Sequence, residues 1–194
     1  MLDQVLKTFE IVPHYDLDIM KENQSLSYIA MQVLEKFDSV LDDFKPDILL
    51  VPGDTSTTFY AAISAFYKNI KIGHVEAGLR TYDIQKPYPE EFNRQATDII
   101  CDYYFAPTQL SKQNLLNEGK KKKKICVTGN TAIDALKTTV SESYEDEVLN
   151  WAKDSKLLLI TAYRRENLGE PMHQMFKAIR KILDECENVK AVYP

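Results

Sequence analysis

Apolar runs and helical periodicities alternate along the chain. Short uninterrupted apolar runs are typical of strands buried on both faces, and apolar residues that return every three or four positions are typical of helices. We expect strands at residues 48–51, 70–75, 99–105, 125–128, 157–160 and 189–193. We expect helices at residues 1–9, 26–44, 57–67, 89–97, 111–117, 131–139 and 172–183, with Ser25 as the N-cap of the second. This alternation predicts an α/β fold with right-handed crossovers and a Rossmann-like parallel sheet covered on both faces.

A polar and acidic segment at residues 141–147 divides this series into two parts. A new strand–helix–strand cycle begins beyond it, so we expect two domains, residues 1–142 and residues 143–194. The chain opens in a helix with no strand before it and ends within a strand. Because a parallel strand needs a neighbour, we expect both domains to be incomplete.

The composition is that of an ordinary soluble globular protein, with 44% hydrophobic and 27% charged residues. The net charge of −5 argues against nucleic-acid binding, because phosphate-binding surfaces usually carry a basic excess. No apolar run reaches the roughly 18 residues typical of a membrane span, and no signal peptide opens the chain, so we expect a cytoplasmic protein. Cys101, Cys126 and Cys186 form no metal-ligand pattern and are expected to be buried free thiols in a reducing compartment.

The first candidate for chemistry is the segment at residues 53–58, which follows the strand at residues 48–51. Gly53 allows close approach of the backbone to a ligand, and free amides at a helix start attract anions such as a phosphate. Alternatively, Asp54 and the neighbouring threonines are only helix caps. The segment has no Walker lysine, which excludes an ordinary nucleoside-triphosphate loop.

His74 lies near the end of the next strand, and Glu76 and Arg80 follow it, so their turn should lie beside that of Asp54. In open α/β sheets, ligands bind at this edge. Alternation along the strand puts His74 and Glu76 on the same side, although a lone histidine there is more often a hydrogen-bonded core residue than a catalyst. Glu76 is harder to explain structurally, because carboxylates are seldom buried without a partner. Arg80 could be that partner.

Residues 89–94 add two glutamates and an arginine. A proline followed by two acids is typical of a helix start, and Glu90 and Arg94, four residues apart, could pair on one helical face. If Asp54, Glu76 and Glu90 converge on one cleft, their environments could separate them into a general acid and a general base.

The second domain offers a further candidate directly after its first strand. Tyr163, Arg164 and Arg165 lie there, and paired arginines suit phosphate or carboxylate binding by forked hydrogen bonds. On their own, such arginines are more often surface charges. The lysine run at residues 120–124 is expected to be a solvated loop.

Six motifs occur in order along essentially the whole chain, at residues 53–55, 74–81, 89–94, 105–108, 127–131 and 164–167. Together they resemble the motifs of the non-hydrolysing UDP-N-acetylglucosamine 2-epimerases. The resemblance implies a two-domain GT-B fold of two Rossmann-like halves, with the sugar nucleotide in the cleft between them. It also implies interconversion of UDP-N-acetylglucosamine and UDP-N-acetylmannosamine for bacterial surface polysaccharides, usually in a homodimer.

In that family the reaction removes the proton at C2 of the sugar and expels UDP. The resulting glycal takes UDP back with a proton delivered to the opposite face. The resemblance therefore implies proton transfer by Asp54, Glu76 and Glu90, with no metal or nicotinamide cofactor. It implies substrate binding, or positioning of these carboxylates, by His74, Arg80, Arg94, Tyr163, Arg164 and Arg165. The last two would lie near the nucleotide or at a second, regulatory sugar-nucleotide site.

The chain departs from the family pattern in several places. Tyr163 and Pro52 stand where histidines are common, and a neutral tyrosine cannot supply positive charge against a leaving pyrophosphate. The family's first strand, with its glycine-threonine-arginine-proline-glutamate motif, and the later part of its second domain have no counterpart here. Two alternatives to an active epimerase stay open: a non-catalytic remnant that binds sugar nucleotide weakly or not at all, and a relative of the hydrolysing epimerases, which release free N-acetylmannosamine.

Overall fold

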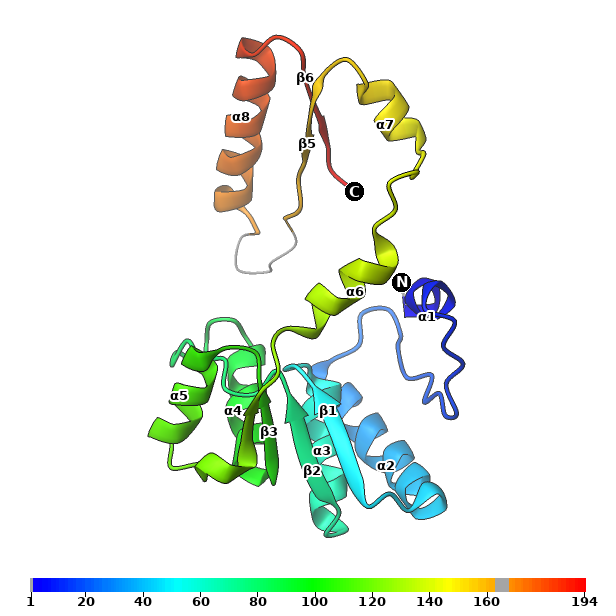
Figure 1. Ribbon diagram of the computed structural model, residues 1–194, viewed down its shortest axis with the longest axis vertical. Helices are drawn as coiled ribbons and strands as arrows, with labels where there is room; N and C mark the ends of the chain where they lie inside the picture. The colour runs from blue at the N-terminus through cyan, green and yellow to red at the C-terminus, as the bar shows by residue number, and fades with distance from the viewer. Residues whose placement is uncertain (1, 163–167) are drawn as a thin grey trace. The chain divides into compact units, whose positions relative to one another are not determined.

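The chain divides into two compact units, residues 1–139 and 140–194. The computed structural model describes residues 2–162 and 168–194 (Figure 1). The division falls between Thr139 and Val140, whereas the polar segment of the sequence placed the boundary after residue 142. Each unit contains a parallel sheet of its own.

A parallel sheet of four strands in the order β1-β2-β3-β4 forms the centre of the first unit. Its strands are β1 (Ile48–Pro52), β2 (Lys71–Val75), β3 (Tyr103–Ala106) and β4 (Ile125–Val127). Its helices are α1 (Leu2–Thr8), α2 (Leu26–Phe44), α3 (Ser56–Tyr67), α4 (Glu90–Ile100), α5 (Gln109–Asn117) and α6 (Thr131–Thr139), with a 3₁₀ turn, η1 (Lys122–Lys124). The register pairs Pro52 with Val75, and Val75 with Phe105, so the carboxyl ends of these strands lie at one edge. The predicted α/β architecture is confirmed.

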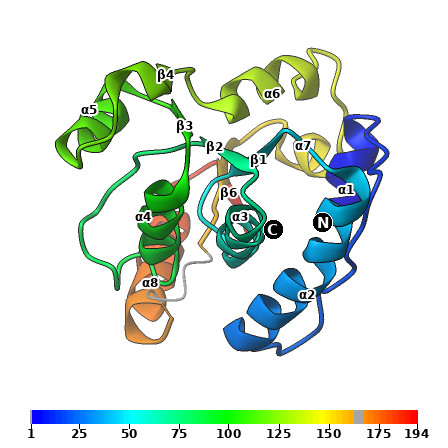
Figure 2. The same cartoon turned by 90° about the horizontal axis from the view of Figure 1, so that it is seen from below.

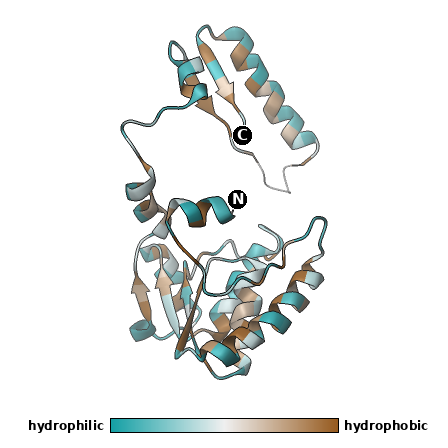
Figure 3. Ribbon diagram, turned by 90° about the vertical axis from the view of Figure 1, so that its right-hand side faces the viewer, coloured by the Kyte–Doolittle hydropathy of each residue, from teal (hydrophilic) through white to brown (hydrophobic). Residues whose placement is uncertain are grey.

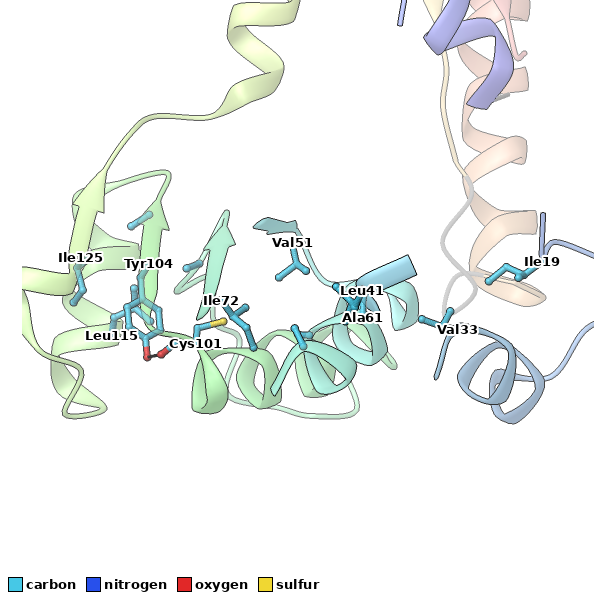
Figure 4. Packing of buried hydrophobic residues seen from close by; sticks show 14 residues of the cluster. Ile19, Val33, Leu41, Val51, Ala61, Ile72, Cys101, Tyr104, Leu115 and Ile125 are labelled. Carbon is cyan, nitrogen blue, oxygen red and sulfur yellow. Dashed lines mark hydrogen bonds between the residues drawn. The ribbon is translucent and has the colours of Figure 1, made fainter. Parts of the chain in front are cut away.

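Helices α2, α3 and α4 form a layer on one face of this sheet (Figure 2). Core residues Val51, Ile72 and Tyr104 point from the strands into this helix layer (Figure 4). On the other face of β1, Ile48 and Leu50 are exposed. The expectation that helices cover both faces is therefore wrong at this strand within the described residues.

Side-chain caps mark the starts of several helices. Ser25 Oγ accepts a hydrogen bond of 3.1 Å from the main-chain N–H of Tyr28 at the start of α2, as predicted. Thr55 and Thr108 cap α3 and α5 in the same way. Such a cap stabilises a helix by about 1 kcal/mol. Most helices carry hydrophobic residues on one side and hydrophilic residues on the other (Figure 3).

The boundary between α4 and β3 differs from the prediction. The apolar run at residues 99–105 predicted a strand, but α4 continues to Ile100 and β3 begins at Tyr103. Ile99 is 73% exposed, so it lies on the outer side of α4 rather than in the sheet. The hydrophobic pattern misplaces this boundary because the buried side of α4 is polar.

The second unit pairs strands β5 (Lys156–Leu159) and β6 (Val189–Val192) in parallel. Helix α7 (Glu147–Ala152) was not predicted, because it is short and begins within the polar segment. Its start is fixed by Asp146, whose carboxylate accepts a hydrogen bond of 2.8 Å from Val148 N–H. Helix α8 (Glu170–Glu185) contains the helix predicted at residues 172–183 and extends it at both ends.

The cysteines differ in burial. Cys101 is buried, but Cys126 and Cys186 are exposed free thiols, so the expectation of three buried thiols is wrong for two of them. On β4, Ile125 faces the core and alternation turns Cys126 outward. Cys186 directly follows the end of α8.

Candidate active site

Asp54 lies in the turn between β1 and α3, at the carboxyl end of β1. Its Oδ2 is 3.2 Å from Nη1 of Arg94 on α4, and its main-chain carbonyl accepts a hydrogen bond of 2.9 Å from Asn93 Nδ2. The cap of α3 is Thr55, whose Oγ1 accepts from Thr58 N–H at 3.2 Å. The threonine is therefore the cap, and the Asp54 carboxylate, 28% exposed, pairs with Arg94 instead.

Glu76 lies at the carboxyl end of β2 with φ +68°, in the left-handed region that few non-glycine residues adopt. Gly53 lies opposite, and a Cβ added to it would be 3.7 Å from Glu76 Oε2. Gly53 N–H also donates a hydrogen bond of 2.9 Å to the Val75 carbonyl. The turns that carry Asp54 and Glu76 are therefore direct neighbours, as the strand-end motifs predicted.

Glu90 and Glu91 occupy the first turn of α4 but differ in surroundings. Glu91 is fully buried, and its Oε1 accepts hydrogen bonds of 3.0 Å from the N–H groups of both Thr81 and Tyr82. Its Oε2 lies 2.6 Å from Nε of Arg94. The predicted pairing of Glu90 with Arg94 is therefore wrong, because Arg94 pairs with Glu91 three residues earlier in the chain. Glu90 is half-buried and makes no side-chain hydrogen bond to the described part of the chain.

The charge of Glu91 is stabilised by its hydrogen bonds. Burial alone opposes ionisation, but donors from Gln95, the Tyr82 amide, Arg94 and the Thr81 amide outweigh it. The pKa of Glu91 therefore lies below its ordinary value, and an ionised Glu91 ties the loop at residues 81–82 to α4.

A second buried ion cluster is centred on Asp98 of α4. Its Oδ1 lies 2.6 Å from His74 Nδ1, and its Oδ2 accepts from Arg80 Nη2 at 2.6 Å and from Gly78 N–H at 3.2 Å. Burial opposes the charge of Asp98, yet the contacts of His74 and Arg80 hold the pKa of this carboxyl below its ordinary value. The cluster joins α4 to β2 and to the turn that follows it.

Arg80 does not pair with Glu76. Its side chain is fully buried, and its Nε lies 2.6 Å from Oε1 of Glu118 at the end of α5, in addition to the contact with Asp98. Burial opposes its charge, but Glu118 and Asp98 raise the pKa of the guanidinium further above its ordinary value. The suggested pairing of Arg80 with Glu76 is therefore wrong.

His74 is a hydrogen-bonded core residue, as its lone position on the strand indicated. It is fully buried, and its Nε2 lies 2.7 Å from the Gly53 carbonyl. The polar atoms of His74 and Arg80 are thus occupied by protein groups, and substrate binding by these two residues stays a prediction. Tyr163, Arg164 and Arg165 lie outside the described residues.

Sequence reasoning missed Asn93, Asp98 and Glu118 and chose the wrong glutamate as the partner of Arg94. A usable signal was present in α4. Glu91, Arg94 and Asp98 recur at three- and four-residue spacing, which marks one helical face. Polar residues at that spacing, beside apolar positions that point outward, indicate a helix whose buried face carries ion pairs.

The described residues, 2–162 and 168–194, contain no group of three or more His, Cys, Asp or Glu side chains arranged to hold a metal ion. In the same ranges, no helix is long and apolar enough to cross a membrane. What the geometry does offer is two partly exposed carboxylates, Asp54 and Glu76, on adjoining turns. Such groups can accept or donate protons on a bound molecule.

Comparison with known proteins adds a family to this geometry. Residues 1–194 match the family model described as UDP-N-acetylglucosamine 2-epimerase. The UDP-N-acetylglucosamine 2-epimerase of Bacillus subtilis is 57% identical over 194 residues, which are 100% of this chain and 51% of that protein. The chain thus spans about half the length of the curated relatives it matches.

Two of the solved structures that match the whole chain are described with a bound UDP or UDP-sugar. The UDP-GlcNAc 2-epimerase from Neisseria meningitidis bound to UDP-GlcNAc is 45% identical with a TM-score of 0.92, and 54% of that chain is covered. The S. aureus MnaA–UDP co-structure is 49% identical with a TM-score of 0.94, and 51% of that chain is covered.

Proposed function

Since the chain belongs to the UDP-N-acetylglucosamine 2-epimerase family, we propose that the protein containing it interconverts UDP-N-acetylglucosamine and UDP-N-acetylmannosamine. The observation that carries the proposal is the placement of Asp54 and Glu76 on adjoining strand-end turns. Relatives whose structures are described as bound to UDP or UDP-GlcNAc support the choice of a UDP-sugar as substrate. A homodimer, a cytoplasmic location and a role in surface polysaccharide synthesis belong to the same proposal.

The proposed reaction needs a base and an acid at C2. One carboxylate takes the C2 proton while the bond between C1 and the UDP oxygen breaks, which leaves a glycal and UDP. A carboxylic acid then delivers a proton to the opposite face of C2 as the UDP oxygen bonds C1 again. Asp54, Glu76 and Glu90 are the proposed proton carriers, and Arg94 positions Asp54.

The remaining assignments follow the sequence motifs. Residues 1–142 are proposed as the N-terminal catalytic domain and residues 143–194 as part of the nucleotide-binding domain. Arg164 and Arg165 would hold the phosphates of the nucleotide or of a regulatory UDP-sugar, with Tyr163 beside them as a neutral hydrogen-bond donor.

The test is incubation with UDP-N-acetylglucosamine in deuterated water, followed by proton NMR. The 194-residue chain is assayed first, together with any longer reading frame found by sequencing the DNA on either side. We expect little or no conversion by the 194-residue chain, which spans about half the length of its relatives, and the manno epimer with solvent deuterium at C2 from the longer protein. Complete absence of both from the longest protein would favour the non-catalytic remnant, and free N-acetylmannosamine together with UDP would favour the hydrolysing relative.

Substitutions distinguish the residues that transfer protons from those that do not. Asp54→Asn, Glu76→Gln and Glu90→Gln are each expected to slow deuterium incorporation by about 10²- to 10⁴-fold, the usual loss when an acid or base is removed. Glu35→Gln, on the exposed side of α2, is the matched control and should leave the rate unchanged. An undiminished rate in any of the three would remove that residue from the mechanism.

A further inference from the structure

Both ring nitrogens of His74 face hydrogen-bond acceptors. Nε2 lies 2.7 Å from the main-chain carbonyl oxygen of Gly53, and Nδ1 lies 2.6 Å from Oδ1 of Asp98. A carbonyl oxygen can only accept, so Nε2 must carry a proton. The proton of the short contact between His74 and Asp98 resides either on Nδ1 of the imidazole or on the carboxyl oxygen.

The surroundings of Asp98 favour the ionised carboxylate. Its Oδ2 accepts from the Arg80 guanidinium at 2.6 Å and from Gly78 N–H at 3.2 Å. Two donors on one oxygen, one of them permanently charged, stabilise the anion and not the neutral acid. An ionised Asp98 is acceptor-only, so Nδ1 of His74 must carry a proton as well.

We infer that His74 is held as a buried imidazolium by Asp98, and that Asp98 is a positioning residue for the turns that carry Asp54 and Glu76. Through His74 it holds the carbonyl of Gly53, the residue before Asp54. Directly, it holds the amide of Gly78, two residues after Glu76. One carboxylate on α4 thus sets the relative placement of both turns, and the catalytic part of this inference rests on the proposed function.

The other ionisable groups nearby leave this assignment intact. Glu118, on the far side of Arg80, balances the guanidinium, so the cluster holds two cations and two anions. Burial and the charge of Asp98 raise the pKa of the Cys101 thiol, which keeps it neutral. Tyr104 donates its hydroxyl to the carbonyls of Asp98 and Cys101, at 3.1 Å and 2.8 Å.

One further carboxylate and an amine complete the surroundings. Asp102 accepts from the main-chain N–H of Ile72 at 3.1 Å and makes no contact with the imidazole. Lys120 lies over the Tyr104 ring, with Nζ 5.7 Å from the centroid. Asp98 is therefore the anion that contacts His74 in the described part of the chain.

The protonation state is measurable by nitrogen-15 NMR of the imidazole rings in the intact 194-residue chain. At about pH 8 we expect His74 to show two protonated ring nitrogens and two N–H protons, because both nitrogens face hydrogen-bond acceptors. The exposed His14 and His173 supply the other two imidazole signals of the chain. A variant with both His14→Asn and His173→Asn assigns the remaining signals. A bare Nδ1 on His74 at that pH would overturn the inference.

Asp98→Asn tests whether Asp98 holds the second proton on His74. A neutral amide can donate to Nδ1, so the second proton of His74 should be lost at the same pH while the ring stays buried. Asp98→Glu, which keeps the charge, should keep the imidazolium signature. Asp102→Asn, in the turn that follows α4, is the matched control and should leave the His74 signals unchanged. If Asp98→Asn does not fold, the spectrum of the unsubstituted chain still decides the protonation state.

The effect of Asp98 on catalysis is measured separately from the protonation state of His74. In the epimerisation assay, Asp98→Asn should lower kcat by up to about 10²-fold with a smaller change in KM, because displaced carboxylates lose reactive geometry before they lose binding. An unchanged kcat, together with loss of the imidazolium signature, would reject the positioning role. Absence of C2 exchange in the unsubstituted protein would reject the proposed function and leave the NMR result standing.

Discussion

The Arg94 guanidinium on α4 binds the Asp54 carboxylate in the turn after β1, with Nη1 3.2 Å from Oδ2. The same guanidinium neutralises Glu91, which is fully buried. A buried carboxylate that loses its cation costs about 3–5 kcal/mol. We therefore expect Arg94→Met to lower the free energy of unfolding of the first unit by about that amount, as measured by urea denaturation.

An exposed ion pair in the same unit supplies the control. Lys137 of α6 pairs with Asp134 at 2.9 Å, and its side chain is 78% exposed. Lys137→Met removes the same kind of charge from the surface and should change stability by no more than about 0.5 kcal/mol. Equal losses of stability in Arg94→Met and Lys137→Met would show that the burial of ionised Glu91 does not require the charge of Arg94.

The lowered pKa of Glu91 predicts a particular pH dependence. Because this pKa lies below its ordinary value of 4.5, the unfolded chain binds more protons than the folded one between the two values. The contribution of Glu91 to stability is then fully present above pH 4.5 and is lost as the pH falls through the folded pKa. We expect Glu91→Gln to cost about 1–3 kcal/mol at neutral pH, and the difference from the unsubstituted chain to shrink below about pH 4.5.

The neighbouring glutamate provides the comparison for this pH series. Glu90→Gln alters a side chain that makes no hydrogen bond within residues 2–162 and 168–194. Its free energy of unfolding should stay within about 0.5 kcal/mol of that of the unsubstituted chain across the pH series. A loss of stability in Glu91→Gln that does not change with pH would contradict the lowered pKa. The shape of the side chain alone would then account for the loss.

The sequence predicted the turns with Asp54 and Glu76 because each follows an apolar run of buried strand residues. In a parallel sheet, such runs must end at the same edge. It could not predict the partners of these turns, because the amphipathic pattern of α4 is reversed. Phe92 and Ile99 of that helix are exposed, while Glu91 is fully buried.

Rules based on hydrophobic periodicity assume that the apolar side of a helix faces the core. In α4, ion pairs replace that side, so this rule extended a strand into the last turn of the helix. The pairing of Glu90 with Arg94 came instead from their four-residue spacing. The choice between glutamates one residue apart depends on which side of α4 meets β2. That contact is set by His74 and Asp98, which lie 24 residues apart in the chain.

Gly78 is expected to tolerate no side chain. Its φ is +83°, and an added Cβ would lie 2.3 Å from the Ser111 carbonyl oxygen and 2.8 Å from Leu115 Cγ. Gly78→Ala should cost about 2–5 kcal/mol, from left-handed strain together with overpacking. Gly119→Ala is the matched control, since its φ is +79° and no atom lies within 4 Å of the added Cβ, so about 1–2 kcal/mol of strain remains. Similar losses at both glycines would contradict the close packing of α5 on this turn.

Thiol labelling should distinguish the three cysteines. Cys126 and Cys186 are exposed, whereas Cys101 is buried and its thiol pKa is raised, chiefly by burial. Because the thiolate is the reactive form, a disulfide reagent should modify two thiols rapidly in the native chain and the third only after denaturation. Cys101→Ala should leave the rapid phase unchanged, and a third rapid thiol would contradict the burial of Cys101.

The left-handed backbone conformation of Glu76 should lower the free energy of unfolding of the protein. Its φ of +68° costs an alanine roughly 1–2 kcal/mol that a glycine avoids, partly offset by the larger entropy of unfolded glycine. We therefore expect Glu76→Gly to be more stable than Glu76→Ala by about 1 kcal/mol in urea unfolding. At Ser39, an exposed position within α2, the same pair of substitutions should give the opposite order, with alanine more stable by about 1 kcal/mol. If alanine is the more stable residue at both positions, the backbone of Glu76 is not strained. If glycine is the more stable at position 76 only, the protein gives up stability to hold this carboxylate beside Gly53.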